Sequence, residues 1–165
     1  MNIQRILRHL VMTHWQAKRA FPHQTLIAIE HAIKASDSAH VGEIRFVVEG
    51  ALHSGPLFKG QSARERAIEV FSLLRVWDTE HNNGLLIYLL LADRAVEIVA
   101  DRGIHSKVGS REWEDICRNM ETRFKQANYE GGVVGGIQAV TQHLIKHFPA
   151  SSAGQNELSD KPVLL

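Results

Sequence analysis

The feature that most constrains this fold is a pair of apolar segments separated by only two residues. Eight consecutive apolar residues, 85–92, are followed by Asp93-Arg94 and then by the segment AVEIVAD, residues 95–101. An apolar run of this length is typical of a strand that is buried on both faces. Two such segments joined by so short a turn must be antiparallel neighbours. The sequence therefore predicts a central β-hairpin over residues 85–101.

A further strand is predicted over residues 43–49 (EIRFVVE), because apolar and charged residues alternate there. Between this strand and the hairpin, Ser62 and Glu65 have the spacing of a capping box, and the apolar positions that follow, as far as Trp77, have helical spacing. A strand, a helix and a strand in succession favour a parallel pair joined by a right-handed crossover.

Helical patterns over about residues 22–36, 110–124 and 132–147 complete the expected fold. We predict an α/β fold, a three-layer sandwich in which a small mixed sheet (parallel crossover plus antiparallel hairpin) is flanked by helices on both faces. We expect three parts: a basic amphipathic helix over residues 1–21, the main domain over 22–148, and a flexible tail over 149–165, where Ser, Gly and Pro are frequent.

Composition excludes several classes of protein. Of the 165 residues 44% are hydrophobic and 22% charged, as in an ordinary globular protein. The net charge of +1 gives no basic excess of the kind that nucleic-acid binders show, so we expect no nucleic-acid partner. The single cysteine, Cys117, excludes an intrachain disulfide and lies on an apolar helix face, where we expect it to be buried and inert.

The first 21 residues carry four lysine and arginine residues and no acid. Their apolar residues have helical spacing rather than the continuous run of a signal peptide, and no segment of the chain is long enough to span a bilayer, so we expect a cytoplasmic protein. The apolar face either packs on the domain's own core, which we favour, or lies on an anionic membrane surface, which would place the protein at the inner membrane.

The densest polar segment runs from Asp78 to Asp101 and contains five acids against one arginine. The antiparallel reversal brings residues 82–84 and 101–105 to one edge of the sheet, where the strand over residues 43–49 also begins. The polar residues expected to converge there are Glu43, Glu80, His81, Asn82, Asn83, Asp101, Arg102 and His105. The candidate metal ligands are Asp101, Glu80, Asn82, Asn83, Glu43 and Asp78. The alternative is that these side chains only form the hydrogen bonds that turns and helix ends require.

Two other features carry less weight. Asp93 falls at the opposite edge of the sheet, and we interpret it as a turn residue. His143 and His147 have a spacing that suits zinc, but no third ligand is visible, so we interpret both as surface residues.

Several segments taken together resemble the TPM domain family over residues 24–148. They are Trp77 at the end of the crossover helix, NNGLLIYLL, ADRAVEIVADRGI, and RFKQANYEGGVVGGIQAV at residues 123–140. The resemblance implies a metal-binding groove at one sheet edge, and calcium binding and a weak acid phosphatase activity are attributed to some family members. Asn82, Asn83 and Gly84 match the family's NNG motif.

This sequence also departs from the family pattern. Asp101 and Gly103 occupy the two glycine positions of the family's G-x-G, so that Asp101 adds a candidate ligand. His105 replaces an acidic residue just beyond, which favours a divalent metal softer than Ca²⁺.

Two functions follow as hypotheses. The one we favour is a metal-binding interaction or assembly module for an unidentified protein partner, which could be membrane-associated. Its expected contact surfaces are residues 1–21 and the loop at 50–60, where we expect Leu57 and Phe58 to be exposed. The alternative is a weak metal-dependent acid phosphatase. In it the metal ligands are Asp101 and Glu80, the proton donor is His105 or His81, and Arg102 holds the phosphate.

Overall fold

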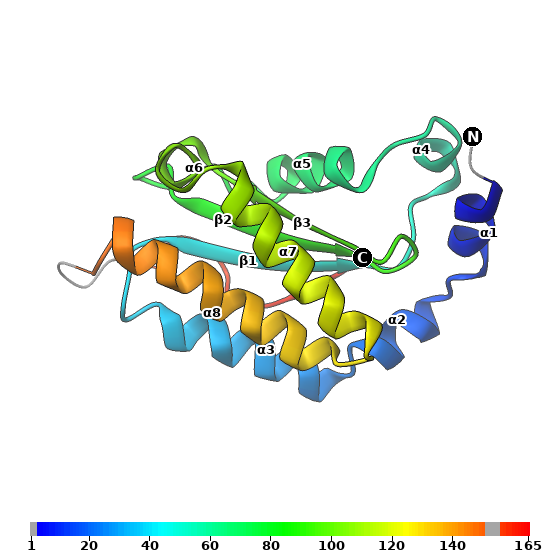
Figure 1. The fold of residues 1–165 in the computed structure, drawn as a ribbon, viewed down its shortest axis with the longest axis horizontal. Helices are drawn as coiled ribbons and strands as arrows, with labels where there is room; N and C mark the ends of the chain where they lie inside the picture. The colour runs from blue at the N-terminus through cyan, green and yellow to red at the C-terminus, as the bar shows by residue number, and fades with distance from the viewer. Residues whose placement is uncertain (1–2, 151–155) are drawn as a thin grey trace.

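The computed structural model describes residues 3–150 and 156–165, which form a four-stranded mixed sheet covered by helices (Figure 1). The strands are β1 (Glu43–Glu49), β2 (Gly84–Leu90), β3 (Ala95–Ala100) and β4 (Val163–Leu164), in the spatial order β3-β2-β1-β4. β1 runs parallel to β2 and to β4, whereas β2 and β3 are antiparallel. The predicted crossover and the predicted hairpin are both confirmed.

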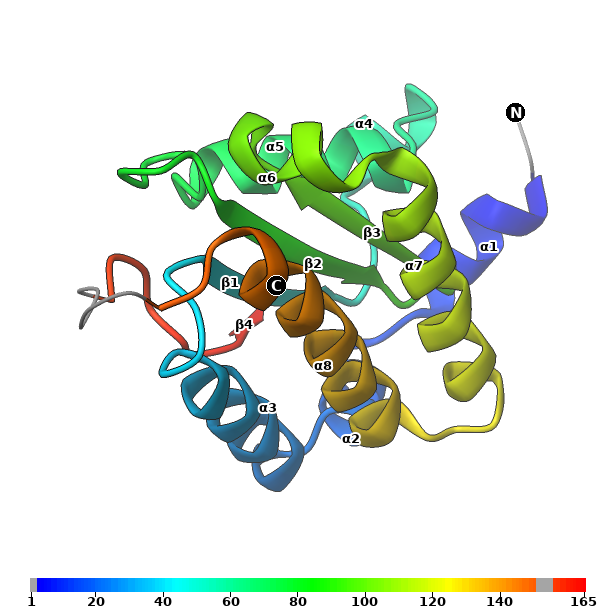
Figure 2. The same cartoon turned by 60° about the vertical axis from the view of Figure 1, so that its left-hand side comes forward.

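Helices cover both faces of the sheet (Figures 1 and 2). α4 (Ser54–Phe58) and α5 (Ala63–Leu73) lie on one face, and α3 (His23–Ser36), α7 (Ser110–Lys125) and α8 (Tyr129–His147) lie on the other. Successive residues of β2 enter two separate cores: Leu85 and Ile87 pack against one set of helices, and Leu86 and Tyr88 against the other. The unbroken apolar run therefore reflects burial on both faces, and the predicted three-layer sandwich is confirmed.

The N-terminal segment forms two helices, α1 (Ile3–Val11) and α2 (His14–Ala20), where one was expected. Thr13 separates them, because its hydroxyl accepts a hydrogen bond from the Gln16 N–H at 3.2 Å while the Gln16 side chain accepts one from the Thr13 N–H at 2.9 Å. This capping box starts a new helix and changes the direction of the chain. α2 buries Ala17 in the core, and Phe21 just beyond it is buried in the same core.

The C-terminal segment differs from the expected flexible tail. Residues 151–155 lie outside the described residues, but further along the chain Val163 and Leu164 pair with Val47 and Val48 of β1. The Leu165 N–H also donates to the Val48 carbonyl at 2.9 Å. A strand of two residues is too short to show a hydrophobic period, and its partner lies more than 100 positions away, so the sequence pattern could not reveal it.

Two more local expectations are corrected. Residues 102–108 form a helix, α6 (Arg102–Val108), where no helix was predicted. Leu57 and Phe58, which we expected on an exposed loop, lie in α4, where Leu57 is buried and Phe58 is exposed.

β3 lies at the edge of the sheet, and side chains bind its outward-facing backbone groups. Arg64 donates to the Ile98 carbonyl at 2.5 Å, and the Glu121 carboxylate accepts from the Val96 N–H at 3.0 Å. These side chains replace the hydrogen bonds that a neighbouring strand would make. Within residues 3–150 and 156–165, no helix is both long and apolar enough to cross a membrane.

Candidate functional site at the sheet rim

The beginning of β2 and the end of β3 meet at one rim of the sheet, as expected. The Asp101 N–H donates to the Gly84 carbonyl at 2.9 Å, which holds the residue after β3 against the first residue of β2. Glu43 is the β-sheet partner of Gly84 on the other side. The backbones of Glu43, Gly84 and Asp101 therefore form one row across three neighbouring segments.

Asn83 is fully buried in the turn that precedes β2. Its backbone N–H donates to the Thr79 hydroxyl at 3.1 Å, and its side-chain Nδ2 donates to the Val41 carbonyl at 3.0 Å. Its Oδ1 is shielded from solvent and has no hydrogen-bond partner in the described structure. A buried amide oxygen without a partner is costly, which makes this atom a candidate ligand.

Asp101 is the N-cap residue of α6, because its Oδ1 accepts the Arg102 N–H at 2.7 Å. The other carboxylate oxygen, Oδ2, is also shielded and has no hydrogen-bond partner within the described part of the chain. The Asp101 side chain is therefore satisfied at one oxygen only. Aspartate is a preferred N-cap residue, so Asp101 was a signal in the sequence from which the start of α6 could have been predicted.

The turn at residues 81–82 packs directly against the first turn of α6. A Cβ placed on Gly103 would lie 2.4 Å from the Asn82 carbonyl oxygen and 2.6 Å from that of His81, so only glycine allows this approach. Arg102 Nε also donates to Asn82 Oδ1 at 3.4 Å. The rim therefore brings together Asn82, Asn83, Asp101 and Arg102 from two distant segments, as the sequence predicted.

Glu43 binds the C-terminal segment. Its carboxylate accepts hydrogen bonds from the Glu157 N–H at 2.9 Å and the Leu158 N–H at 3.2 Å. Burial raises the pKa of Glu43 to about 7, although the two backbone hydrogen bonds act in the opposite direction. Its role in the structure is to hold residues 157–158 against β1.

The remaining acids of the predicted cluster face solvent. Asp78 forms an exposed ion pair with Arg75 at 2.9 Å. The Glu80 side chain is exposed, and its backbone N–H donates to the Glu157 carboxylate at 3.1 Å. His81 is exposed as well, with Nε2 4.0 Å from the Glu80 carboxylate.

His105 lines a pocket of about 470 Å³ between β3 and α7, together with Trp113 and Cys117. Asn82, Asn83 and Asp101 are not among the described residues that line it. Cys117 is buried, and burial raises the pKa of its thiol to about 12, so the thiolate form is suppressed. The His143 ring packs edge-on against Trp113, with 5.4 Å between the ring centroids.

Across the described residues, no three His, Cys, Asp or Glu side chains come close enough together to hold a metal ion. A cation at the rim would therefore have to use amide and backbone carbonyl oxygens beside the Asp101 carboxylate. Such oxygens suit a hard cation such as Ca²⁺.

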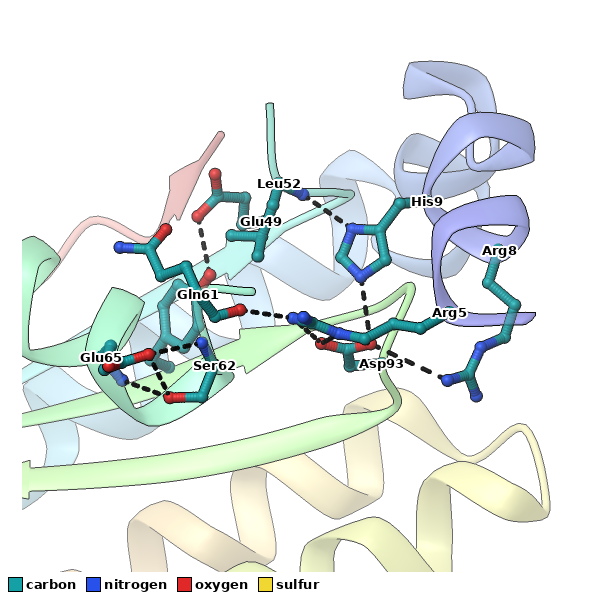
Figure 3. Close-up of polar contacts among 10 residues, drawn as sticks. Arg5, Arg8, His9, Glu49, Leu52, Gln61, Ser62, Glu65 and Asp93 are labelled. Carbon is teal, nitrogen blue, oxygen red and sulfur yellow. Dashed lines mark hydrogen bonds and ion pairs between the residues drawn. The ribbon is translucent and has the colours of Figure 1, made fainter. Parts of the chain in front are cut away.

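Sequence reasoning missed the polar cluster at the other end of the sheet (Figure 3). Asp93, which we interpreted as a turn residue, accepts hydrogen bonds from Arg5 at 2.7 Å and pairs with His9 at 3.0 Å. Arg8 lies 3.9 Å from the same carboxylate. The available signal was the position of these three basic residues on one face of an acid-free segment.

A buried network lies near that cluster. Glu49, almost completely buried, accepts a hydrogen bond from the Tyr88 hydroxyl at 2.7 Å and two from Arg66 at 2.9 and 3.1 Å. The negative charge of Glu49 is therefore compensated inside the protein by Arg66.

Comparison with known protein families shows which family has this fold and these motifs. The model of the TPM domain matches residues 17–143. The chain belongs to the TPM domain family. The resemblance drawn from the NNG motif and the hairpin is thereby confirmed.

Two solved structures are similar to this TPM domain. The NMR structure of the BA42 protein from the psychrophilic bacterium Bizionia argentinensis is 29% identical, with a TM-score of 0.76, covering 86% of this chain and 93% of that one. The NMR structure of the N-terminal domain of a P. gingivalis protein is 20% identical, with a TM-score of 0.63 and coverage of 78% and 80%, and shows the shared fold alone. No curated protein matches the chain.

Proposed function

We propose that this TPM domain is a divalent-cation-binding interaction module with its cation site at the rim where β2 begins and β3 ends. The observation that carries the proposal is the pair of shielded oxygen atoms without partners, Asn83 Oδ1 and Asp101 Oδ2. A cation in reach of both atoms would satisfy them and would compensate the Asp101 charge.

Calcium fits the donors better than other biological cations. Ca²⁺ accepts six to eight oxygen ligands and combines carboxylate, amide, carbonyl and water oxygens in flexible geometry. Asp101 and Asn83 would hold it, and Asn82 lies beside them through its contact with Arg102. Asp101 would supply the charge, and Asn83 a neutral oxygen whose position is fixed by its bond to Val41.

The chemistry of an enzyme finds less support. Of the two expected proton donors, His105 lines the pocket with Trp113 and Cys117, which none of the rim asparagines lines within the described structure, and His81 at the rim is exposed to solvent. A phosphatase would require a proton donor close to the metal ligands. We therefore favour a binding role over the phosphatase alternative.

The test is a titration of metal-free protein with Ca²⁺, Mg²⁺, Mn²⁺ and Zn²⁺ while the melting temperature is followed. At calcium concentrations about a hundredfold above Kd, we expect a rise of roughly 5–10 °C. The variant Asp101→Asn should lose most of this rise. Asparagine is also a good N-cap, so the substitution leaves the start of α6 intact while removing the charge.

Glu80→Gln is the matched control, because Glu80 is an exposed acid of the same rim. We expect its calcium response to equal that of the wild type. An equal response in Asp101→Asn, or no response of the wild type to any of the four cations, would contradict the proposal. Turnover of p-nitrophenyl phosphate that depends on metal and disappears in Asp101→Asn would instead support the phosphatase.

A further inference from the structure

The N-terminal helix α1 faces the protein with its polar side. His9 is buried; its Nδ1 accepts the Leu52 N–H at 3.0 Å, and its Nε2 lies 3.0 Å from Asp93 Oδ1. Arg5 reaches the same carboxylate and also donates to the Gln61 carbonyl at 2.7 Å. Figure 3 shows Arg5, Arg8 and His9 converging on Asp93. Polar contacts therefore attach α1 to the hairpin turn.

The apolar side of the same helix faces outward. Its residues, together with Trp15 of α2, are 54–69% exposed: Ile3, Leu7, Leu10, Val11 and Trp15. The first four follow the spacing i, i+4, i+7, i+8, so they form one continuous stripe. We expected the apolar face to pack on the domain's own core, but of the apolar residues of α1 only Ile6 is partly buried against a core, and the stripe of the other four faces solvent. A cluster of large exposed apolar side chains marks an interaction surface.

The charge around this stripe indicates the chemistry of the partner. Residues 1–21 contain no Asp or Glu. Arg8, Lys18 and Arg19 are all exposed, and Arg19 lies over the Trp15 ring, 5.3 Å from its centroid. Tryptophan and basic residues beside an apolar helix face are the combination that favours the headgroup region of an anionic bilayer.

The geometry points to a lipid surface, and we propose that α1 and α2 lie on an anionic bilayer. The stripe from Ile3 to Val11 would enter the boundary between headgroups and acyl chains, with Trp15 at the same depth. α1 has nine residues and is about 13 Å long, so it can lie in the plane of the interface but cannot cross the bilayer. The contacts with Asp93 would keep the rest of the domain attached to the bound helix. This surface is separate from the rim and does not depend on cation binding there.

Vesicle co-sedimentation of the full chain tests the proposal. We expect the wild type to bind vesicles of phosphatidylcholine and phosphatidylglycerol, and to bind much less to phosphatidylcholine alone. The double variant Leu7→Gln/Leu10→Gln should weaken binding to the mixed vesicles about tenfold or more, because it removes two apolar side chains from the stripe. Both residues are exposed, so the melting temperature should stay close to that of the wild type.

A matched control is Leu73→Gln, which removes an equally exposed leucine from α5 and should leave vesicle binding unchanged. The variant Lys18→Gln/Arg19→Gln should weaken binding to the anionic vesicles, and added salt should reduce the difference. Trp15 should report insertion as a blue shift of fluorescence that is absent in Trp15→Phe.

Three results would overturn the proposal. One is no binding to the anionic vesicles. Another is equal binding to neutral and anionic vesicles. The third is a dimer in light scattering that Leu7→Gln/Leu10→Gln dissociates while vesicle binding is unaffected; that result would make a second copy of the chain the occupant of the stripe.

Discussion

Asp93 shows how a single turn residue can hold a whole helix in place. Burial acts to raise the pKa of Asp93, but the hydrogen bonds from Arg5 and His9 outweigh it, so the pKa lies below its ordinary value. The charged carboxylate therefore stabilises the folded protein above the ordinary aspartate pKa. This contribution is lost as the pH falls below that value.

Substitution of Asp93 by asparagine should release α1. Asparagine removes the charge that Arg5 and His9 bind, and we expect a loss of about 2 kcal/mol in the free energy of unfolding. Urea denaturation measures the loss, and faster tryptic cleavage within residues 3–20 locates it. The control Asp78→Asn breaks an exposed ion pair and should cost less than about 0.5 kcal/mol. Equal losses in the two variants would contradict this role of Asp93.

Glu43 gives a prediction for pH dependence. Because burial raises its pKa to about 7 in the folded state, the folded protein binds a proton more tightly than the unfolded chain does. Stability should therefore fall as the pH rises from the ordinary glutamate value through about 7. Thermal unfolding of Glu43→Gln over this range should show a flatter profile than the wild type. Parallel profiles would mean that Glu43 titrates normally.

At the scale of elements, the entry into β2 depends on a glycine. A Cβ on Gly84 would lie 1.9 Å from the Val76 carbonyl oxygen, so the turn between α5 and β2 has no room for alanine. We expect Gly84→Ala to cost at least about 2 kcal/mol in urea denaturation, because backbone must move. Gly55→Ala is the control, since nothing lies within 4 Å of a Cβ there. A Gly84→Ala variant as stable as Gly55→Ala would show that the turn relaxes freely.

The elements that the sequence predicted are those whose signal is local. Alternation over residues 43–49 and the two-residue turn at Asp93-Arg94 were enough for β1 and the hairpin. The elements that were missed depend on distant partners or short signals. β4 exists through its pairing with β1, and the break between α1 and α2 depends on the capping box of Thr13 and Gln16.

The candidate site also has a part that the sequence predicted and a part that it did not. Strand direction alone brings Asn83 and Asp101 to one rim, and the structure bears this out. Side-chain direction could not be predicted: Glu43 binds residues 157–158, and His105 lines the pocket with Trp113. The outward orientation of the apolar stripe on α1 also depends on Asp93, more than 80 positions away.

At the scale of the whole molecule, the β3 edge of the sheet is protected from pairing with other chains. β3 is covered by the hydrogen bonds of Arg64 and Glu121. Removing both side chains in Arg64→Ala/Glu121→Ala should expose the strand's backbone groups and increase aggregation on mild heating, measured by light scattering. Glu114→Ala, an exposed acid on the same helix as Glu121, should aggregate no faster than the wild type.

The complete burial of β1 and β2 has a consequence for the motions of the protein. Every residue of both strands is shielded from solvent between two cores, and β2 is paired along its length with β1 on one side and with β3 on the other. No small local opening exposes these amides to water, so their hydrogen–deuterium exchange should proceed only when the whole domain unfolds. The slowest exchange rates in Glu43–Glu49 and Gly84–Leu90 should then report the global unfolding equilibrium in the absence of denaturant.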